Sequence, residues 1–204
     1  MQNHPNPDPS APTESALPEP LRAFWCGFEK IGKNGETLPL TAPQWAAVKD
    51  IKTGLIWATN WEKHDNFPVT CNLTWYRKGA GDFNGGKNTQ HHVQRVNEQA
   101  WCGKQDWHLP SEAEMESLVT ALCTVHINGR DVREYNQHRY RAIFQHDALD
   151  TFWFASGVTV DDDDWGDAYD GDIATCLDFY SVRFKSAFTK YELWVRTVRV
   201  DRAS

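Results

Sequence analysis

The sequence predicts a mixed α+β domain, and two kinds of periodicity support this class. Residues 89–101 and 112–123 carry apolar side chains three and four positions apart, the period of an amphipathic helix. Short segments between residues 174 and 200 are rich in β-branched and aromatic side chains, which favours strands. We therefore expect two helices packed on a twisted antiparallel sheet, with long irregular loops.

The first twenty residues predict a disordered tail. They are rich in proline and hold almost no large apolar side chains, so burial cannot offset the entropy lost on ordering them. After Leu21 the composition becomes aromatic, beginning with Phe24, Trp25 and Phe28. We divide the chain into a Pro-rich tail, residues 1–20, and a single domain, residues 21–204.

The first half of the domain predicts turns and short strands. Residues 32–35 suggest a turn, and residues 48–57 suggest two short strands around a turn at Thr53-Gly54. The stretch between Trp57 and Gln90 is too rich in glycine for a regular element, so we expect an ordered loop there. A first helix is expected from Thr89 to Trp101, with Gly103 ending it in the left-handed conformation.

The second helix has the most complete start signal in the chain. After Trp107 and Pro110, Ser111 can accept a hydrogen bond from the backbone N–H of Glu114, and the Glu114 carboxylate can accept one from the N–H of Ser111. The apolar residues that follow form one stripe and are Met115, Leu118, Val119 and Leu122, with Cys123 as a small core residue beside them. The acidic residues at this start favour the helix dipole, so they need no catalytic explanation.

The last third of the chain predicts a β-rich half. It begins at Phe144 and residues 152–154, and further strand candidates span residues 174–179, 182–184 and 193–200.

The overall charge and the cysteines limit the classes of function. A net charge of −7 argues against a general nucleic-acid binder, which needs a basic face. No apolar run approaches the roughly eighteen residues of a membrane span, and no apolar signal segment opens the chain. The five cysteines form no Cys-x-x-Cys pair. We expect a cytoplasmic protein with reduced thiols; the alternatives are export without a recognisable leader and an exported protein that has lost its leader.

Five blocks in order carry a family resemblance. They are residues 50–57 (DIKTGLIW), 96–97 (VN), 102–110 (CGKQDWHLP), 152–156 (FWFAS) and 194–199 (WVRTVR). Together they resemble the Lcl C-terminal domain-like family over about residues 28 to 200. The resemblance implies a C-type-lectin-like fold related to the formylglycine-generating enzymes. It also implies ligand binding, since the founding member is the trimeric C-terminal domain of a bacterial collagen-like adhesin that binds sulfated glycans.

The chain departs from the family pattern at three places. His108 stands where the family usually has arginine, so any salt bridge made by that arginine is absent or pH-dependent here. Ala47 and the cysteine-free residues 85–88 stand where exported relatives often have cysteines. These losses fit a reducing compartment.

The densest polar feature is a loop at residues 161–172 with seven aspartates. Calcium is the candidate ion, because it takes several oxygen ligands from flexible loops, although the spacing does not match an EF-hand. The alternative is a solvated acidic loop without metal. The candidate metal ligands are Asp161, Asp162, Asp164, Asp167, Asp170 and Asp172.

Two aromatic residues of this loop, Trp165 and Tyr169, are candidate ligand contacts, since a sugar ring can stack on either while Asp170 accepts its hydroxyl hydrogens. The alternative is that both rings fold back over the sheet. A basic group near the C-terminal strands, Arg183, Lys185 and Lys190, can meet an anionic glycan or a partner's carboxylates, or simply be an exposed strand face.

No catalytic constellation is visible, so we expect a non-catalytic recognition module that binds a glycan or a protein surface and requires no cofactor. One alternative is an interaction subunit of a larger assembly, tethered by the tail. Another is a cysteine-dependent enzyme on a formylglycine-type scaffold, although the cysteine pair that this needs is missing. A homo-oligomer is left open.

Overall fold

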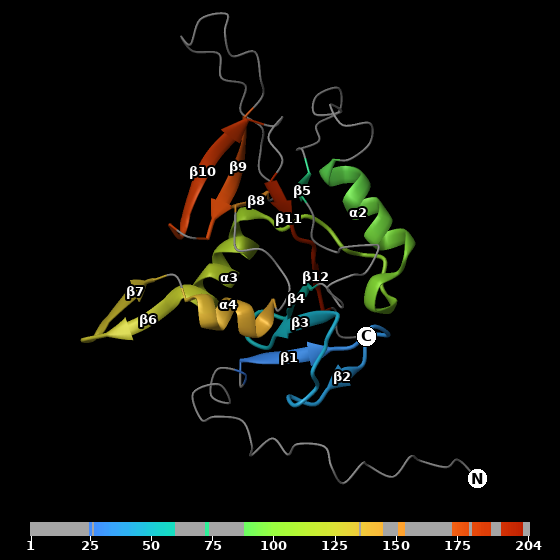
Figure 1. The fold of residues 1–204 in the computed structure, drawn as a ribbon, viewed down its shortest axis with the longest axis horizontal. Helices are drawn as coiled ribbons and strands as arrows, with labels where there is room; N and C mark the ends of the chain where they lie inside the picture. The colour runs from blue at the N-terminus through green and yellow to red at the C-terminus, as the bar shows by residue number, and fades with distance from the viewer. Residues whose placement is uncertain are drawn as a thin grey trace, which may run out of the picture.

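The computed structural model describes residues 25, 27–59, 72–73, 88–134, 136–144, 151–153, 173–179, 181–188 and 193–201. These residues form a mixed α/β structure with three α-helices and mainly antiparallel sheets (Figure 1). The predicted division into a tail and one domain stays a prediction.

The first sheet has five antiparallel strands in the order β12-β4-β3-β1-β2. The predicted hairpin at residues 48–57 is confirmed, because Gly54 adopts a left-handed φ of 70° and its N–H donates to the carbonyl of Asp50 at 2.8 Å. The predicted turn at residues 32–35 is also confirmed. The strands are β1 (Phe28–Ile31), β2 (Thr37–Leu38), β3 (Ala47–Asp50), β4 (Leu55–Ala58) and β12 (Val198–Val200).

The second sheet has the order β10-β9-β8-β11-β5, with a parallel pair between β8 and β11 and antiparallel pairs elsewhere. A separate hairpin, β6 with β7, extends away from the body (Figure 1). The strands of the second sheet are β5 (Asn72–Leu73), β8 (Thr151–Trp153), β9 (Ile173–Asp178), β10 (Arg183–Phe188) and β11 (Leu193–Val195). The hairpin consists of β6 (Thr124–Ile127) and β7 (Arg130–Arg133).

The predicted strand at residues 193–200 is two strands in different sheets. It breaks at Arg196 and Thr197, where the Thr197 carbonyl accepts from the N–H of Ala58 at 3.1 Å and the Arg196 guanidinium donates to the carbonyl of Ala58 at 2.9 Å. These contacts hold the chain where it passes from the second sheet to the first.

The helices are α2 (Thr89–Glu98), α3 (Glu112–Cys123) and α4 (Gln137–Ile143). The expected first helix is shorter than predicted, because Ala100 adopts a left-handed φ of 47° and a 3-10 turn, η2 (Trp101–Gly103), follows it. Gly103 is left-handed as predicted, at φ 69°. The helix α4 was not expected, and Phe144, predicted to begin the β-rich half, is its C-cap.

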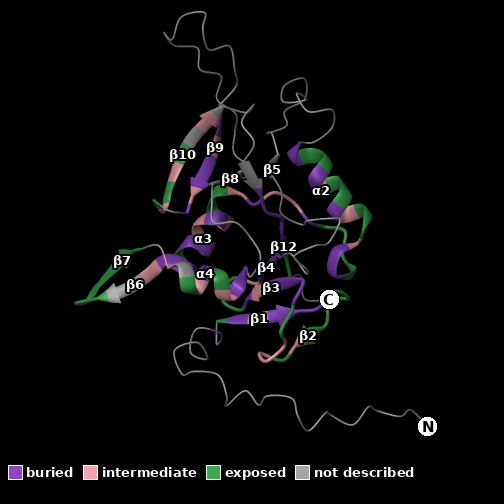
Figure 2. Ribbon diagram, in the orientation of Figure 1, coloured by how far each residue is buried: buried purple, intermediate pink, exposed green. Residues whose placement is uncertain are grey.

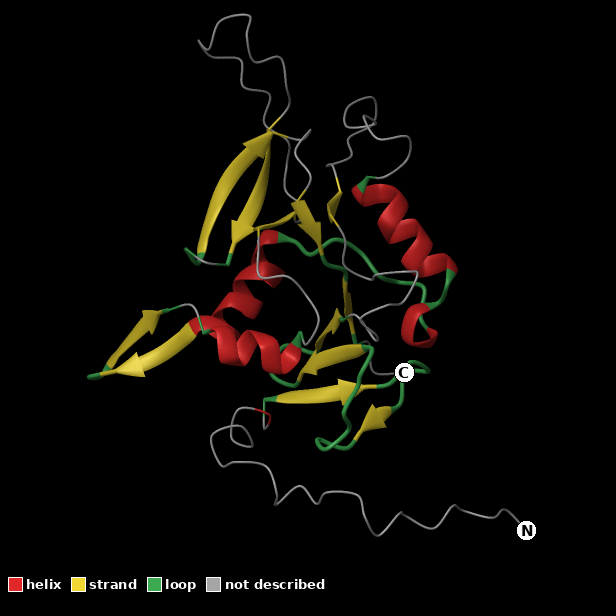
Figure 3. Ribbon diagram, in the orientation of Figure 1, coloured by secondary structure: helices red, strands yellow, loops and turns green. Residues whose placement is uncertain are grey.

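The main core lies between α3, α4 and the sheets. The apolar stripe of α3 is buried as predicted, and Figure 2 shows buried segments along this helix. Cys123, at the end of α3, is also buried. Figure 3 shows α3 and α4 together, with α2 on the other side of β11 and β12. A second core cluster lies beneath α2 and η2 and contains Val96, Trp101, Cys102, Trp107, Ile31, Ile56 and the alanines 46, 47 and 58.

Candidate functional site

Most of the predicted site residues lie outside the described residues. This applies to all six candidate metal ligands, Asp161, Asp162, Asp164, Asp167, Asp170 and Asp172, and to Trp165, Tyr169 and Lys190. Their roles therefore stay predictions. Among the residues that the structure does describe, no group of three or more His, Cys, Asp or Glu side chains could hold a metal ion.

Two predicted contacts, Arg183 and Lys185, lie on β10 and are exposed. They are two residues apart, so they share one face of the strand. The Lys185 ammonium is 2.9 Å from a carboxylate oxygen of Asp178 on β9, and Asp178 stands opposite Arg183 in the register. The basic face predicted for anionic ligands therefore carries an acidic residue as well, which reduces its net charge.

The described residues form an open groove between α2 and the start of α3, with a volume of about 820 Å³. One wall is the N-terminal half of α2, and the other is the extended segment that leads into α3. The lining residues are Thr89, Gln90, Val93, Gln94, His108, Leu109, Ser111 and Glu114. The lining thus combines residues with hydrogen-bonding side chains and two partly buried apolar residues, Val93 and Leu109, a composition found in small-ligand sites.

The α2 wall is held against the extended segment by Asn97. Its side-chain amide donates to the carbonyl of Trp107 and accepts from the N–H of Trp107, both at 2.9 Å. The buried indole of Trp107 donates to the carbonyl of Trp101 at 2.9 Å. Asn88 caps α2, because its side-chain oxygen accepts from the N–H of His91 at 3.0 Å.

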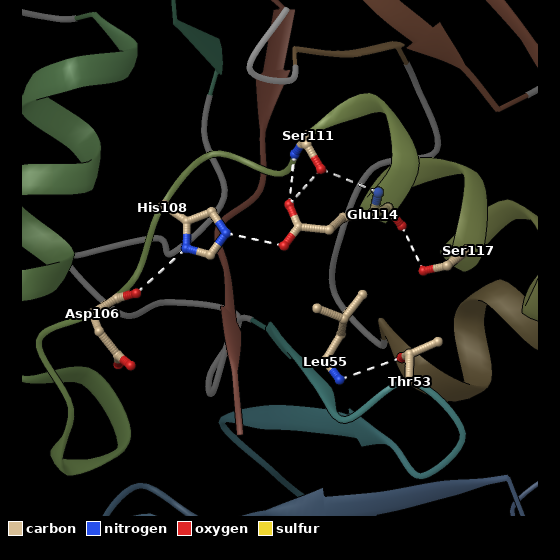
Figure 4. Close-up of polar contacts among 7 residues, drawn as sticks. All are labelled: Thr53, Leu55, Asp106, His108, Ser111, Glu114 and Ser117. Atoms are coloured by element: carbon tan, nitrogen blue, oxygen red, sulfur yellow. Dashed lines mark hydrogen bonds and ion pairs between the residues drawn. The ribbon is translucent and has the colours of Figure 1, made fainter. Parts of the chain in front are cut away.

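The other wall is fixed by the predicted capping box, which is confirmed (Figure 4). The N–H of Glu114 donates to the Ser111 hydroxyl at 3.3 Å, and the N–H of Ser111 donates to the Glu114 carboxylate at 2.7 Å. The Ser111 hydroxyl also donates to this carboxylate, at 2.9 Å. The carboxylate therefore has a fixed orientation at the edge of the groove.

His108 lies between α2 and the start of α3 and contacts this carboxylate (Figure 4). Its Nε2 is 3.1 Å from Oε1 of Glu114, and its Nδ1 is 3.4 Å from the carbonyl oxygen of Asp106. Burial alone would raise the pKa of Glu114, but hydrogen bonds from Ser111 and His108 lower it below its ordinary value. His108, which stands where the family usually has arginine, thus pairs with the carboxylate of Glu114. A pH-dependent salt bridge at this position was one of the two expectations from the sequence.

The sequence profile of the Lcl C-terminal domain matches residues 46–199, which is more than half of the chain. The chain belongs to the Lcl C-terminal domain family. The groove lies wholly within the matched part of this Lcl C-terminal domain. Comparisons with curated proteins and with solved structures found no match. No helix of the described residues is long and apolar enough to cross a membrane.

The serine, glutamate and histidine of this Lcl C-terminal domain do not form a catalytic triad. In a triad the histidine lies between the serine and the carboxylate and takes the serine proton. Here the Ser111 hydroxyl donates to Glu114, so the imidazole of His108 is not its base. The carboxylate lies between the two other groups, which suits a structural network or a hydrogen-bonding rim.

The described thiols are also poorly suited to nucleophilic chemistry. Burial raises the pKa of Cys102 to about 12 and that of Cys176 to about 11. Burial raises the pKa of Cys123 as well. A nucleophilic cysteine needs the thiolate form near neutral pH, and these three residues stay protonated there.

The groove was not recognised from the sequence. Gln90, Val93 and Gln94 are spaced three and four residues apart, so they mark one mixed face of α2. That pattern alone is common on exposed helices. The contact between Asn97 and Trp107, which brings the two walls together, has no local sequence signal.

The Glu114 network predicts an acid-dependent contribution to stability. Because the folded pKa of Glu114 is lowered, its contribution is present above the pKa of the unfolded chain and disappears as pH falls through the folded pKa. We expect Glu114→Gln to lower the free energy of unfolding by about 1 kcal/mol at pH 7, and the difference from wild type to shrink below about pH 4. Urea unfolding of both proteins measures this difference between about pH 3 and about pH 7, a range that roughly covers the titration of a glutamate. Glu112→Gln, in the same helical turn but outside the network, is the control; an equal effect of both variants would contradict the assignment.

Proposed function

We propose that this domain is a non-catalytic recognition module that binds a glycan or a protein surface. The observation that carries the proposal is the groove between α2 and α3, where Gln90, His108 and Glu114 can offer donors and acceptors and line the same groove as Val93 and Leu109. The arrangement of Ser111 and the raised pKa values of the described thiols support a binding role over nucleophilic catalysis.

A C-type-lectin-like fold, related to the formylglycine-generating enzymes, is part of this proposal. Family membership supports it, as do three helices beside mainly antiparallel sheets. Fold alone does not define a ligand. The groove is therefore the main support for the proposed recognition role.

The loop at residues 161–172 is proposed as a second contact surface, together with β10. Trp165, Tyr169 and Asp170 would contact the ligand, and so would Arg183, Lys185 and Lys190. The exposure of Arg183 and Lys185 supports this arrangement. If the aspartates bind calcium, thermal stability rises with calcium concentration, whereas a merely acidic loop gives a weak response.

Glycan arrays and pull-downs with the full chain test the recognition role. We expect a specific ligand of one of these two kinds. Trp165→Ala with Tyr169→Ala probes the loop, and Val93→Phe probes the groove. Binding lost in one of these variants locates the surface, and the absence of any glycan or protein ligand would contradict the proposal.

A second candidate, an interaction subunit of a larger assembly, is favoured by the β6–β7 hairpin. Its two strands extend from the body (Figure 1). Ile127 and Val132 on these strands are 46 % and 40 % exposed. Exposed apolar residues on a projecting hairpin suit a protein contact. Deleting residues 1–20, the proposed tether, should then abolish association with the assembly while leaving the fold intact.

A further inference from the structure

The extended segment that forms one wall of the groove has a backbone edge whose N–H and C=O groups are only partly hydrogen-bonded. His108 forms an isolated antiparallel bridge with Val198, in which each N–H donates to the other's carbonyl at 2.9 Å. Backbone groups of successive residues in an extended segment point in opposite directions. The N–H and C=O groups of Trp107 therefore point away from Val198, toward Asn97 on α2, and the same alternation turns those of Leu109 to this side.

The two residues on this edge differ in what they bind. The N–H and C=O of Trp107 are both paired with the side-chain amide of Asn97 on α2. Leu109 comes next on the same edge and lines the groove. On α2, Val93 lies one helical turn before Asn97 and lines the same groove. Within the described part of the chain, neither the N–H nor the C=O of Leu109 has a hydrogen-bond partner.

We propose that the N–H and C=O of Leu109 bind two adjacent hydroxyl groups of a neutral sugar. One hydroxyl donates to the carbonyl of Leu109, and its neighbour accepts from the N–H. The side-chain amide of Asn97 makes the same kind of pairing with Trp107, the neighbouring residue on this edge: its N–H donates to the Trp107 carbonyl, and its oxygen accepts from the Trp107 N–H. This inference rests on the proposed recognition function and names its ligand class.

The surroundings of Leu109 favour a neutral sugar over a peptide strand. A peptide that extends a sheet pairs with several residues along an edge. Here the side chain of Asn97 is already bound to the backbone of Trp107, and the N–H of Ser111, the next residue on this edge after Leu109, donates to Glu114, so the free edge is a single residue. A sugar ring needs only this one pair.

The Glu114 carboxylate on the groove disfavours an anionic ligand. The carboxylate of Glu114 lines the same groove as Leu109, and its pKa is lowered, so it is ionised near neutral pH. A sulfate or carboxylate group would be repelled by it. Hydroxyls can donate to both Glu114 and the Leu109 carbonyl, while the apolar face of a sugar ring packs on Val93.

Amide chemical shifts of the full chain test this assignment. The probes are the neutral methyl glycosides of glucose, mannose and galactose, galactose 6-sulfate as an anionic sugar, and acetamide as a stand-in for the side-chain amide of a protein ligand. We expect at least one neutral glycoside to shift the Leu109 amide signal saturably. Val93→Phe narrows the groove and should weaken this binding at least about tenfold, as expected for loss of roughly 1.4 kcal/mol.

Matched variants separate binding in the groove from binding elsewhere on the domain. Gln99→Phe places the same ring on an exposed residue of α2's C-terminus that does not line the groove, and it should bind like wild type. Gln90→Trp, at an exposed position of the groove wall, replaces Val93→Phe if that variant does not fold. Binding of a neutral glycoside that Val93→Phe and Gln90→Trp leave unchanged would overturn this inference but not the recognition function. Preference for galactose 6-sulfate or acetamide over the neutral glycosides would also overturn the inference of a neutral sugar. Absence of any glycan or protein ligand would contradict both this inference and the proposed recognition function.

Discussion

Arg196→Ala should lower the free energy of unfolding by about 3–5 kcal/mol. The Arg196 side chain is fully buried, and its guanidinium donates to the carbonyl of Ala58 at 2.9 Å and to the hydroxyl of Tyr140 at 3.0 Å. Its Cζ also lies 3.5 Å from the centre of the Phe144 ring. Truncation would leave both acceptors buried without this donor and would open a cavity.

Two further variants identify the cause of this loss. The stability of all three variants is measured by urea unfolding at neutral pH. Arg196→Lys keeps the positive charge, but a single ammonium lacks the planar fork that reaches both acceptors, so we expect an intermediate loss. Arg183→Ala removes an exposed arginine from β10 and should change stability by no more than about 0.5 kcal/mol. A loss below about 1 kcal/mol for Arg196→Ala would show that the buried guanidinium does not hold the two sheets and α4 together.

The features predicted correctly depend on neighbouring residues in the sequence. The capping box of Ser111 and Glu114, the buried stripe of α3 and the β3–β4 hairpin each follow from residues a few positions apart. The helix α4 was missed because it has only seven residues, too few to show a helical period clearly.

The features missed depend on contacts between distant parts of the chain. Arginine is usually exposed, so the burial of Arg196 follows from contacts with distant residues, among them Ala58 and Tyr140, which are 138 and 56 residues away. The groove likewise requires α2 to dock against the segment before α3. The predicted acidic loop is a local pattern of aspartates, and its ligands stay a prediction.

Trp107→Ala should cost about 3–5 kcal/mol of unfolding free energy, because the indole is 2 % exposed and fills the second core cluster. The same residue fixes the groove, since its backbone is paired with Asn97 and its indole N–H donates to the carbonyl of Trp101. Trp107→Phe keeps most of the buried ring but removes that donor, so we expect a smaller loss of about 1–3 kcal/mol.

Urea unfolding and the Leu109 amide signal together distinguish anchoring from simple core filling. If the wall of the groove is anchored by the backbone of residue 107 and not by its indole, Trp107→Phe should leave the Leu109 signal close to its wild-type position, because the pairing of Asn97 with that backbone needs no indole. Asn97→Ala removes that pairing and leaves the core intact, so it should move the Leu109 signal more than Trp107→Phe does while costing less stability than Trp107→Ala. The reverse order of the two signal shifts would show that the indole, and not the amide of Asn97, positions the free backbone edge.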